Sequence, residues 1–203
     1  MIILGLTGSI GMGKSATAQM FEEAGLPVYD ADAAVHALYE QDGAAVGPLS
    51  ERFGDILKDG AVDRAALRAK VVNDPDAMKD LEAIVHPLVG LTQLNFRQEA
   101  LESGAKIAVL DIPLLYETGG DQRCDHVAVV TAPADVQKAR VLMRGEMSED
   151  QFEQIRAKQM PDADKRARAD FVISTAFGFE FTRAHVHAII DLLSGLESTK
   201  GDD

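Results

Sequence analysis

The chain has 203 residues and a formal net charge of −13 at pH 7, with 46% hydrophobic and 26% charged residues, a composition typical of one globular core with room for a small inserted subdomain. The excess of acids argues against nucleic-acid binding, because phosphate backbones are bound by surplus lysine and arginine. No apolar stretch approaches the ~20 residues that span a bilayer, and the first residues lack a signal-peptide pattern, so we expect a cytoplasmic protein with no membrane partner.

The first expected element is a strand over 2–6, and it leads directly into a glycine-rich loop. Residues 8–15 fit the pattern G-x-x-x-x-G-K-[ST] at every required position. Glycines let backbone N–H groups approach phosphates, Lys14 reaches the β- and γ-phosphates, and the Ser15 hydroxyl ligands Mg²⁺. A helix expected over 14–24 adds the positive end of its dipole. The pattern predicts a site for a nucleoside triphosphate, formed by Gly8, Gly11, Met12, Gly13, Lys14, Ser15 and Ala16.

A second strand is expected around 26–29, after Gly25 ends the helix, and it leads into Asp30-Ala31-Asp32. If the strand continues, Asp30 and Asp32 face the same side, because strand side chains alternate with a period of two. Phosphoryl transfer to a hydroxyl needs a carboxylate that takes the proton, and Asp32 is our candidate for this base. On spacing alone, an equal alternative makes Asp32 the N-cap of a helix beginning at Ala33.

Residues 35–104 show mostly helical patterns broken by turn signals, as expected for a helical insertion into a sheet domain. Proline disfavours helix at the residue before it, so His86, which precedes Pro87, is predicted to stand at a helix start and present its imidazole. A lone histidine is more often structural. The other turn signals are Asp42-Gly43, Gly47-Pro48, Asp59-Gly60 and Asn73-Asp74-Pro75.

A strand expected over 106–110 ends in Asp111, at a position that commonly supports Mg²⁺ or its waters in phosphate-loop proteins. Leu114 and Tyr116 follow as candidates for the wall of an acceptor pocket, with a buried turn and one capping acid as a nearly equal alternative. Further strands are expected over 126–130 and 171–173. Short strands alternating with helices predict an α/β fold with a parallel sheet and ligands at the carboxyl ends of its strands.

Residues 136–168 are the most basic part of the acidic chain. Arg140 and Arg144 lie one helical turn apart and therefore share a face, and a second helical pattern begins near Ser148 and is followed by Gln159. This arrangement predicts a mobile lid that brings guanidinium groups over the triphosphate and excludes water. The alternative is a solvated helix face of mixed charge. The polar residues 197–203 are predicted to form a flexible tail.

Taken together, these segments resemble the dephospho-coenzyme A kinase family over nearly the whole chain. The resemblance implies a three-layer P-loop fold with a parallel sheet, in which the nucleotide-binding core comprises 1–34, 105–135 and 169–196. It also implies a helical acceptor-binding insertion over 35–104 and a lid over 136–168. The segments that carry it are the phosphate loop, Asp30-Ala31-Asp32, Phe53-Gly54, Asp63-Arg64, Leu81-Glu82 through His86-Pro87, residues 111–117, Arg140, Arg144, Gln159-Met160 and residues 169–173.

The same resemblance implies a reaction: ATP-dependent phosphorylation of the ribose 3′-hydroxyl of dephospho-coenzyme A, the last step of coenzyme A synthesis. We therefore expect a kinase, monomeric or weakly self-associating, whose partners are ATP, Mg²⁺ and dephospho-coenzyme A. The chain departs from the family pattern near the adenine, at 174–178, so no base-contacting residue is named. The implied roles are Asp32 as base, Lys14 with Arg140 or Arg144 as charge stabilisers, Ser15 and Asp111 at the metal, and Asp30, His86, Leu114 and Tyr116 at the acceptor.

Two other functions fit parts of the pattern. A kinase for a nucleoside monophosphate or another hydroxylated metabolite would use the same loop, sheet and lid, but a nucleoside monophosphate would require an arginine-rich acceptor pocket. Residues 35–104 supply only Arg52, Arg64, Arg68 and Arg97. A nucleotide switch is the second alternative, yet the N-K-x-D pattern that recognises guanine is absent from the sequence.

Overall fold

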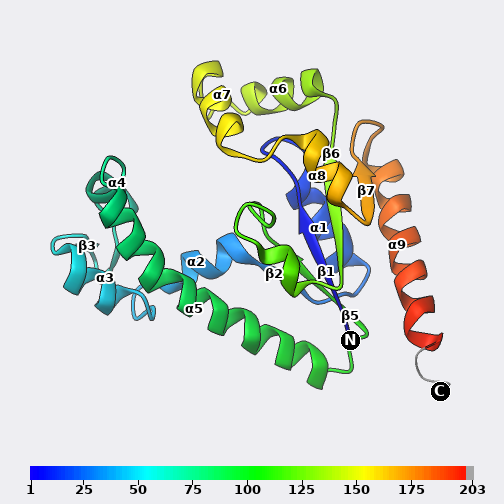
Figure 1. Cartoon of the computed structure of the whole chain (residues 1–203), viewed down its shortest axis with the longest axis horizontal. Helices are drawn as coiled ribbons and strands as arrows, with labels where there is room; N and C mark the ends of the chain where they lie inside the picture. Colours follow the sequence, from blue (N-terminus) through cyan, green and yellow to red (C-terminus); the bar gives the residue numbers. More distant parts are fainter. Residues whose placement is uncertain (200–203) are drawn as a thin grey trace. The chain divides into compact units, whose positions relative to one another are not determined.

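The computed structural model describes residues 1–199, with side chains to 196 (Figure 1). Contacts divide the chain into two compact units, of which the second is Asp30–Glu99 and the first comprises Met1–Tyr29 with the chain from Ala100 onward. The insertion was expected over 35–104, so the structure moves both of its boundaries toward the amino terminus. Of the expected tail, 197–199 belongs to the last helix, and 200–203 lies outside the described residues.

A five-stranded sheet of order β2-β5-β1-β6-β7 forms the centre of the first unit (Figure 1). β1 pairs in parallel with β5 and β6, and β6 pairs in parallel with β7. Every residue of β1 and β5 is buried, as expected for strands of a parallel sheet covered on both faces. The α/β fold with a parallel sheet is confirmed. The strands are β1 (Ile2–Thr7), β2 (Val28–Asp30), β5 (Ile107–Asp111), β6 (His126–Thr131) and β7 (Phe171–Ser174).

The helices of the first unit surround this sheet. α1 and α9 pack on each other, and α8 packs on β6. Leu4 and Leu6 of β1 lie in one buried core with Phe21 of α1 and Leu193 of α9, so hydrophobic burial holds the phosphate loop between a rigid strand and a rigid helix. The bounds are α1 (Lys14–Glu23), the 3₁₀ helix η1 (Gly120–Arg123), α6 (Ala134–Met143), α7 (Glu149–Lys158), α8 (Asp162–Arg168) and α9 (Phe179–Thr199). No helix in the described part of the chain is both long and apolar enough to cross a membrane.

The second unit is built from helices and one small hairpin around its own apolar core. The hairpin was not expected, although its turn at Asp59-Gly60 was. Both turn residues have positive φ, 53° and 82°, which is the backbone that a two-residue type I′ hairpin turn requires. The elements are α2 (Ala31–Tyr39), α3 (Val46–Phe53), β3 (Leu57–Lys58), β4 (Ala61–Val62), α4 (Arg64–Val71) and α5 (Pro75–Glu102).

The structure corrects the local prediction at Asp30 and Asp32. β2 ends at Asp30, whose Oδ1 accepts hydrogen bonds from the amides of Asp32 at 2.8 Å and Ala33 at 3.0 Å. Asp30 is therefore the N-cap of α2, and Asp32 lies exposed in the first helical turn. The two carboxylates do not share one side of an extended strand, and the alternative that Asp32 is the cap is also wrong. Asp30 caps the helix, so the Asp32 carboxylate is not engaged in capping α2.

The prediction that His86 stands at a helix start is also wrong. His86 and Pro87 both lie inside α5, a helix of 28 residues. Proline removes one backbone hydrogen bond from a helix interior and costs about 3 kcal/mol there. The helix persists because side chains such as Ala77 and Val85 are buried in the core of the second unit. His86 itself is exposed.

Candidate phosphoryl-transfer site

The phosphate loop forms a cradle of backbone donors at the carboxyl end of β1. Gly13 caps α1 with φ 92°, a left-handed conformation that strains any other residue. A side chain at Gly8 would place its Cβ 2.7 Å from the carbonyl oxygen of Val130, so this glycine allows the loop to cross β6 closely. In residues 1–199 no acceptor is found for the amides of Gly11, Gly13, Lys14, Ser15 and Ala16. Unpaired amides at a helix N-terminus bind anions.

Two glutamines and one methionine hold the shape of this cradle. Gln137 of α6 donates to the carbonyl of Ile10 at 2.7 Å, and the side-chain oxygen of Gln159 accepts from the Ile10 amide at 3.0 Å. Met12 is buried, and its amide donates to Ser9 within the loop at 3.1 Å. Met12, expected among the nucleotide-binding residues, therefore uses its amide internally and anchors the loop from inside.

Lys14 and Asp111 meet at the ends of neighbouring strands. The register of the parallel pair sets Asp111 of β5 beside Leu6 of β1, and Leu6 lies two residues before the phosphate loop begins at Gly8. The Lys14 ammonium lies 2.6 Å from Asp111 Oδ1, and Asp111 is 2% exposed. The sequence predicted a carboxylate at a strand end, and the order of the sheet brings it to the phosphate loop.

Thr175 joins the end of β7 to both the loop and α6, a connection that sequence reasoning missed. Its hydroxyl donates to the carbonyl of Met12 at 2.8 Å, while Arg140 donates to the same hydroxyl at 2.7 Å and to the Thr175 carbonyl at 2.8 Å. The only signal in the sequence was that 174–178 departs from the family pattern. Arg140 is thereby fixed beside the cradle instead of extending freely from a lid.

A cavity of about 290 Å³ opens beside this connection. Arg140 and Arg144 line it, as expected from their spacing, and Phe179 contributes an aromatic wall. No carboxylate lies within ion-pair distance of either arginine in residues 1–199. The cavity therefore offers unneutralised positive charge next to the phosphate loop. Its other lining residues are Gly11, Gly13, Ala16, Thr17, Met20, Thr175, Gly178 and Thr182.

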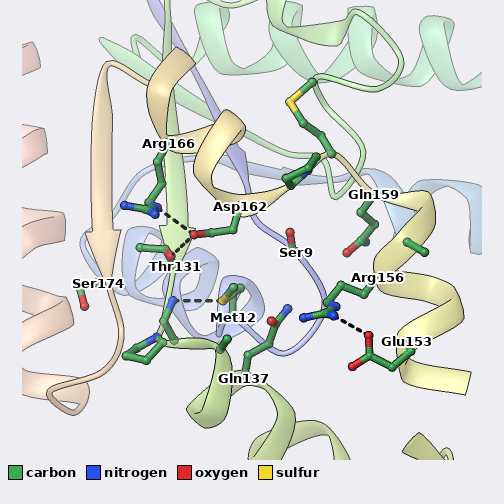
Figure 2. A pocket seen from close by; sticks show the side chains of 16 residues that line it. Ser9, Met12, Thr131, Gln137, Glu153, Arg156, Gln159, Asp162, Arg166 and Ser174 are labelled. Atoms are coloured by element: carbon green, nitrogen blue, oxygen red, sulfur yellow. Dashed lines mark hydrogen bonds and ion pairs between the residues drawn. The ribbon is translucent and has the colours of Figure 1, made fainter. Parts of the chain in front are cut away.

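A larger cavity, of about 750 Å³, lies among the loop, the ends of β6 and β7, and the segment from α7 to α8. Figure 2 shows that its arginines are neutralised: Arg156 pairs with Glu153, and Asp162 accepts hydrogen bonds from both Arg166 and Thr131. This cavity is larger than the one lined by Arg140 and Arg144, but its charges are balanced. We therefore assign the anion to the smaller cavity and the cradle, where the positive charge is unpaired.

Asp32 lines a third cavity, formed entirely by the second unit and about 490 Å³ in volume. Tyr39 of α2 and Leu81 of α5 contribute apolar surface to it, and Arg64 and Arg68 of α4 contribute positive charge. Asp30, expected beside the acceptor, acts as a helix cap and does not line this cavity, and neither does His86.

Leu114 and Tyr116 have different surroundings, although both were expected at the acceptor. Leu114 is 42% exposed, whereas Tyr116 is 6% exposed and lies under the Arg168 guanidinium, 4.2 Å from its ring centre. Burial raises the pKa of the Tyr116 phenol, and the positive charge of Arg168 opposes that rise. Tyr116 therefore acts in the packing of its segment, which agrees with the alternative of a buried turn.

A buried ion pair ties this turn to the segment that follows α7. Lys165 of α8 is fully buried, and its ammonium lies 2.9 Å from Glu117 Oε1 and 3.3 Å from the Pro113 carbonyl. The same Glu117 oxygen accepts the amide of Met160 at 2.8 Å. Burial alone raises the pKa of the Glu117 carboxyl, but the hydrogen bonds from Lys165 and Met160 outweigh it and hold the pKa below the ordinary 4.5.

We expect Glu117→Gln to lower the free energy of unfolding by about 3 kcal/mol at neutral pH, because a buried lysine loses its counter-charge. A carboxyl whose pKa is lowered by folding contributes stability above its ordinary pKa and loses it as pH falls through the folded value. The difference between wild type and variant should therefore be constant above about pH 5 and shrink below 4.5. Urea unfolding at a series of pH values measures this. The control is Asp76→Asn, which removes an exposed ion pair with Lys79 and should change the free energy of unfolding by under about 0.5 kcal/mol at every pH. A stability difference between Glu117→Gln and wild type that does not vary with pH would contradict the lowered pKa of Glu117.

Comparison with known proteins shows which family the chain belongs to. A family model described as dephospho-CoA kinase matches residues 2–178, which include the phosphate loop, Asp32, Asp111, Arg140 and Arg144. The chain belongs to the dephospho-CoA kinase family. Dephospho-CoA kinase from Rhodopseudomonas palustris strain HaA2 is 54% identical over 191 residues, covering 94% of this chain and 95% of the relative. Dephospho-CoA kinase from Mesorhizobium japonicum is 55% identical over 195 residues, covering 96% and 98%.

Solved structures share this fold over 96% of the chain. The crystal structure of TT1252 from Thermus thermophilus superposes with a TM-score of 0.82 at 33% identity, covering 96% of this chain and 97% of that one. Dephospho-CoA kinase from Campylobacter jejuni superposes with a TM-score of 0.72 at 23% identity, covering 96% and 98%. The dephospho-CoA kinase fold thus extends over the sheet, the insertion and the α6–α8 region of this chain.

Proposed function

We propose that this protein transfers the terminal phosphoryl group of ATP to the ribose 3′-hydroxyl of dephospho-coenzyme A, giving coenzyme A and ADP. The observation that carries the proposal is the cradle formed by the unpaired amides of Gly11, Gly13, Lys14, Ser15 and Ala16, with the Lys14 ammonium and two unneutralised arginines beside it. Family membership supplies the acceptor.

The nucleotide binds with its phosphates in the cradle. Backbone amides at the start of α1 donate to phosphate oxygens, and the helix dipole favours their charge. Arg140 and Arg144 stabilise the negative charge that spreads over the transferred group, because both guanidinium groups lack a competing carboxylate among the described residues. Arg140, fixed by Thr175, is oriented before the substrate arrives, which reduces the entropy lost on binding.

Ser15 and Asp111 fit Mg²⁺. The Ser15 side chain is exposed, and Asp111 is a buried carboxylate at the loop, so the pair offers a hydroxyl and a carboxylate oxygen. Mg²⁺ prefers oxygen ligands and is usually held by one or two protein groups, with phosphates and waters completing the shell. Residues 1–199 contain no cluster of three or more acidic, histidine or cysteine ligands, so the phosphates and waters would supply the rest. When bound, the ion neutralises phosphate charge and orients the groups that react.

Asp32 acts as the general base. Its carboxylate accepts the proton of the ribose 3′-hydroxyl as that oxygen bonds to the terminal phosphorus, and the bond from phosphorus to the β–γ bridging oxygen breaks to release ADP. The structure supports this choice because Asp32 is exposed, lines a cavity with two arginines and has no capping duty. Leu114 and His86, both exposed, stay as predictions for acceptor contacts.

Mass spectrometry of the product tests the function. Purified protein incubated with ATP, Mg²⁺ and dephospho-coenzyme A should yield a species one phosphoryl group heavier than the acceptor, together with an equal amount of ADP. Fragmentation should place the new phosphate on the adenosine ribose. ADP release at the same rate without acceptor would instead favour a nucleotide hydrolase, and preferential conversion of a nucleoside monophosphate would favour the rival kinase.

A further inference from the structure

The arginines of this acidic chain fall into three groups in the described residues. Five of them pair with acids: Arg52 with Asp80, Arg156 with Glu153, Arg166 with Asp162, Arg168 with Asp121 and Arg183 with Glu23. Arg97 and Arg123 take part in other interactions. Two pairs have no carboxylate partner within residues 1–199: Arg140 with Arg144, and Arg64 with Arg68.

In each of these two sets, the two arginines are spaced i, i+4 and line the same cavity. Side chains at this spacing lie on one helix face with Cβ atoms about 5–6 Å apart. In a protein of net charge −13, two neighbouring guanidinium groups that share a cavity, with no carboxylate of residues 1–199 within ion-pair distance, indicate a site for an anion. Arg140 and Arg144 belong to the nucleotide site already described, and nothing in the proposed reaction yet uses Arg64 and Arg68.

The cavity that holds Arg64 and Arg68 lies between one face of α2 and one face of α4. The Arg64 guanidinium carbon lies 5.7 Å from the centre of the Tyr39 ring, a contact that orients the side chain over an apolar wall. Burial raises the pKa of the Tyr39 phenol, which therefore stays neutral and does not compete for the guanidinium, although the charge of Arg64 reduces that rise. The face of α2 supplies Asp32, Val35 and Tyr39, and the face of α4 supplies Arg64, Leu67, Arg68 and Val71.

We propose that Arg64 and Arg68 bind the 5′-diphosphate of the acceptor, an inference that rests on the proposed function. The diphosphate is the only ionised group of dephospho-coenzyme A at neutral pH, so charge-based recognition of this substrate has a single target. Two guanidinium groups one helical turn apart match two adjacent phosphoryl groups, each able to accept paired N–H donors. Because the ribose adjoins the diphosphate, the same cavity gives the Asp32 carboxylate access to the ribose.

Steady-state kinetics of Arg64→Gln, Arg68→Gln and the double variant test the proposal. Each single change should raise KM for dephospho-coenzyme A about tenfold and the double change about a hundredfold, the usual effect of removing hydrogen bonds to a charged group. KM for ATP should stay within about twofold, since the nucleotide binds elsewhere. The wild-type KM for dephospho-coenzyme A should rise with ionic strength, and that of the double variant should rise much less.

Lys70→Gln is the matched control. Lys70 lies on the same helix, is exposed and does not line the cavity, so this variant loses the same charge without losing a phosphate contact. The double variant with lysine at both positions should recover part of the affinity, because charge returns without the bidentate fork. Circular dichroism and thermal unfolding check that each variant is folded. An unchanged KM for dephospho-coenzyme A in the double glutamine variant, or equal increases for ATP and acceptor, would overturn the proposal.

Calorimetric titration separates this proposal from the reaction itself. Dephospho-coenzyme A is titrated into wild type, the double glutamine variant and Lys70→Gln in the absence of nucleotide. If the wild type forms no coenzyme A, the proposed function fails, and the titration still decides the arginines. Binding lost only in the double glutamine variant supports the diphosphate site, whereas equal binding by all of the proteins, or none by the wild type, refutes it.

Discussion

Lys14→Ala should lower kcat for phosphoryl transfer by about a thousandfold or more, because it removes a positioned positive charge from the transferred group. The lysine also neutralises a buried acid, since its ammonium lies 2.6 Å from Asp111, and its side chain is 14% exposed. We expect the alanine variant to lose about 1–3 kcal/mol of unfolding free energy as well, because Asp111 loses its counter-charge.

Lys14→Arg separates the two contributions. Arginine keeps the positive charge beside Asp111, so unfolding in urea should give a stability close to that of the wild type. Its planar group does not reproduce the point charge that a phosphate loop presents, so kcat should still fall strongly. Single-turnover measurements with ATP and dephospho-coenzyme A, alongside calorimetry with Mg-ATP, measure both effects. Near-normal kcat in Lys14→Ala would remove the loop lysine from the reaction.

Asp32→Asn should reduce kcat by about a hundredfold to a thousandfold while leaving KM for ATP nearly unchanged. The amide cannot take the proton of the ribose hydroxyl, yet it has nearly the shape of the carboxylate. Stability should not change, because the N-cap of α2 is Asp30 and Asp32 is exposed. Initial rates over a range of both substrates measure kcat and each KM.

Glu40→Gln provides the control for charge. Glu40 is an exposed carboxylate at the C-terminal end of the same helix and pairs with His36 on the surface. The variant should retain kcat, KM and stability within about twofold or 0.5 kcal/mol, as exposed pairs contribute little. If Asp32→Asn matches it in kcat, then Asp32 is not the base, and the carboxylate that accepts the proton lies elsewhere.

Features that depend on neighbouring residues could be predicted from the amino-acid sequence. The phosphate loop is one, because left-handed glycines and a helix start are local backbone properties. The buried strands are another, since continuous apolar runs have few alternatives in an α/β protein. The arginine spacing and the start of a helix near Ser148 were also predicted, and the structure adds a complete capping box at that start.

Other features arose only when distant segments met. Thr175 bonds to Met12, 163 residues away, and thereby sets the orientation of Arg140. Whether a given arginine is neutralised depends on which acid lies beside it in space, so the spacing of Arg64 and Arg68 alone did not indicate an anion site.

The sequence by itself determined the phosphate loop, the parallel sheet and the family of this protein, because those depend on backbone chemistry and apolar patterns within short windows. The tertiary structure alone decided that Asp30 caps the helix and Asp32 is left free. It also decided that His86 lies in mid-helix and that Lys165 neutralises Glu117. These outcomes depend on competition between a local hydrogen bond or helix breaker and the burial of side chains supplied by other segments, and that competition is settled only when the core forms.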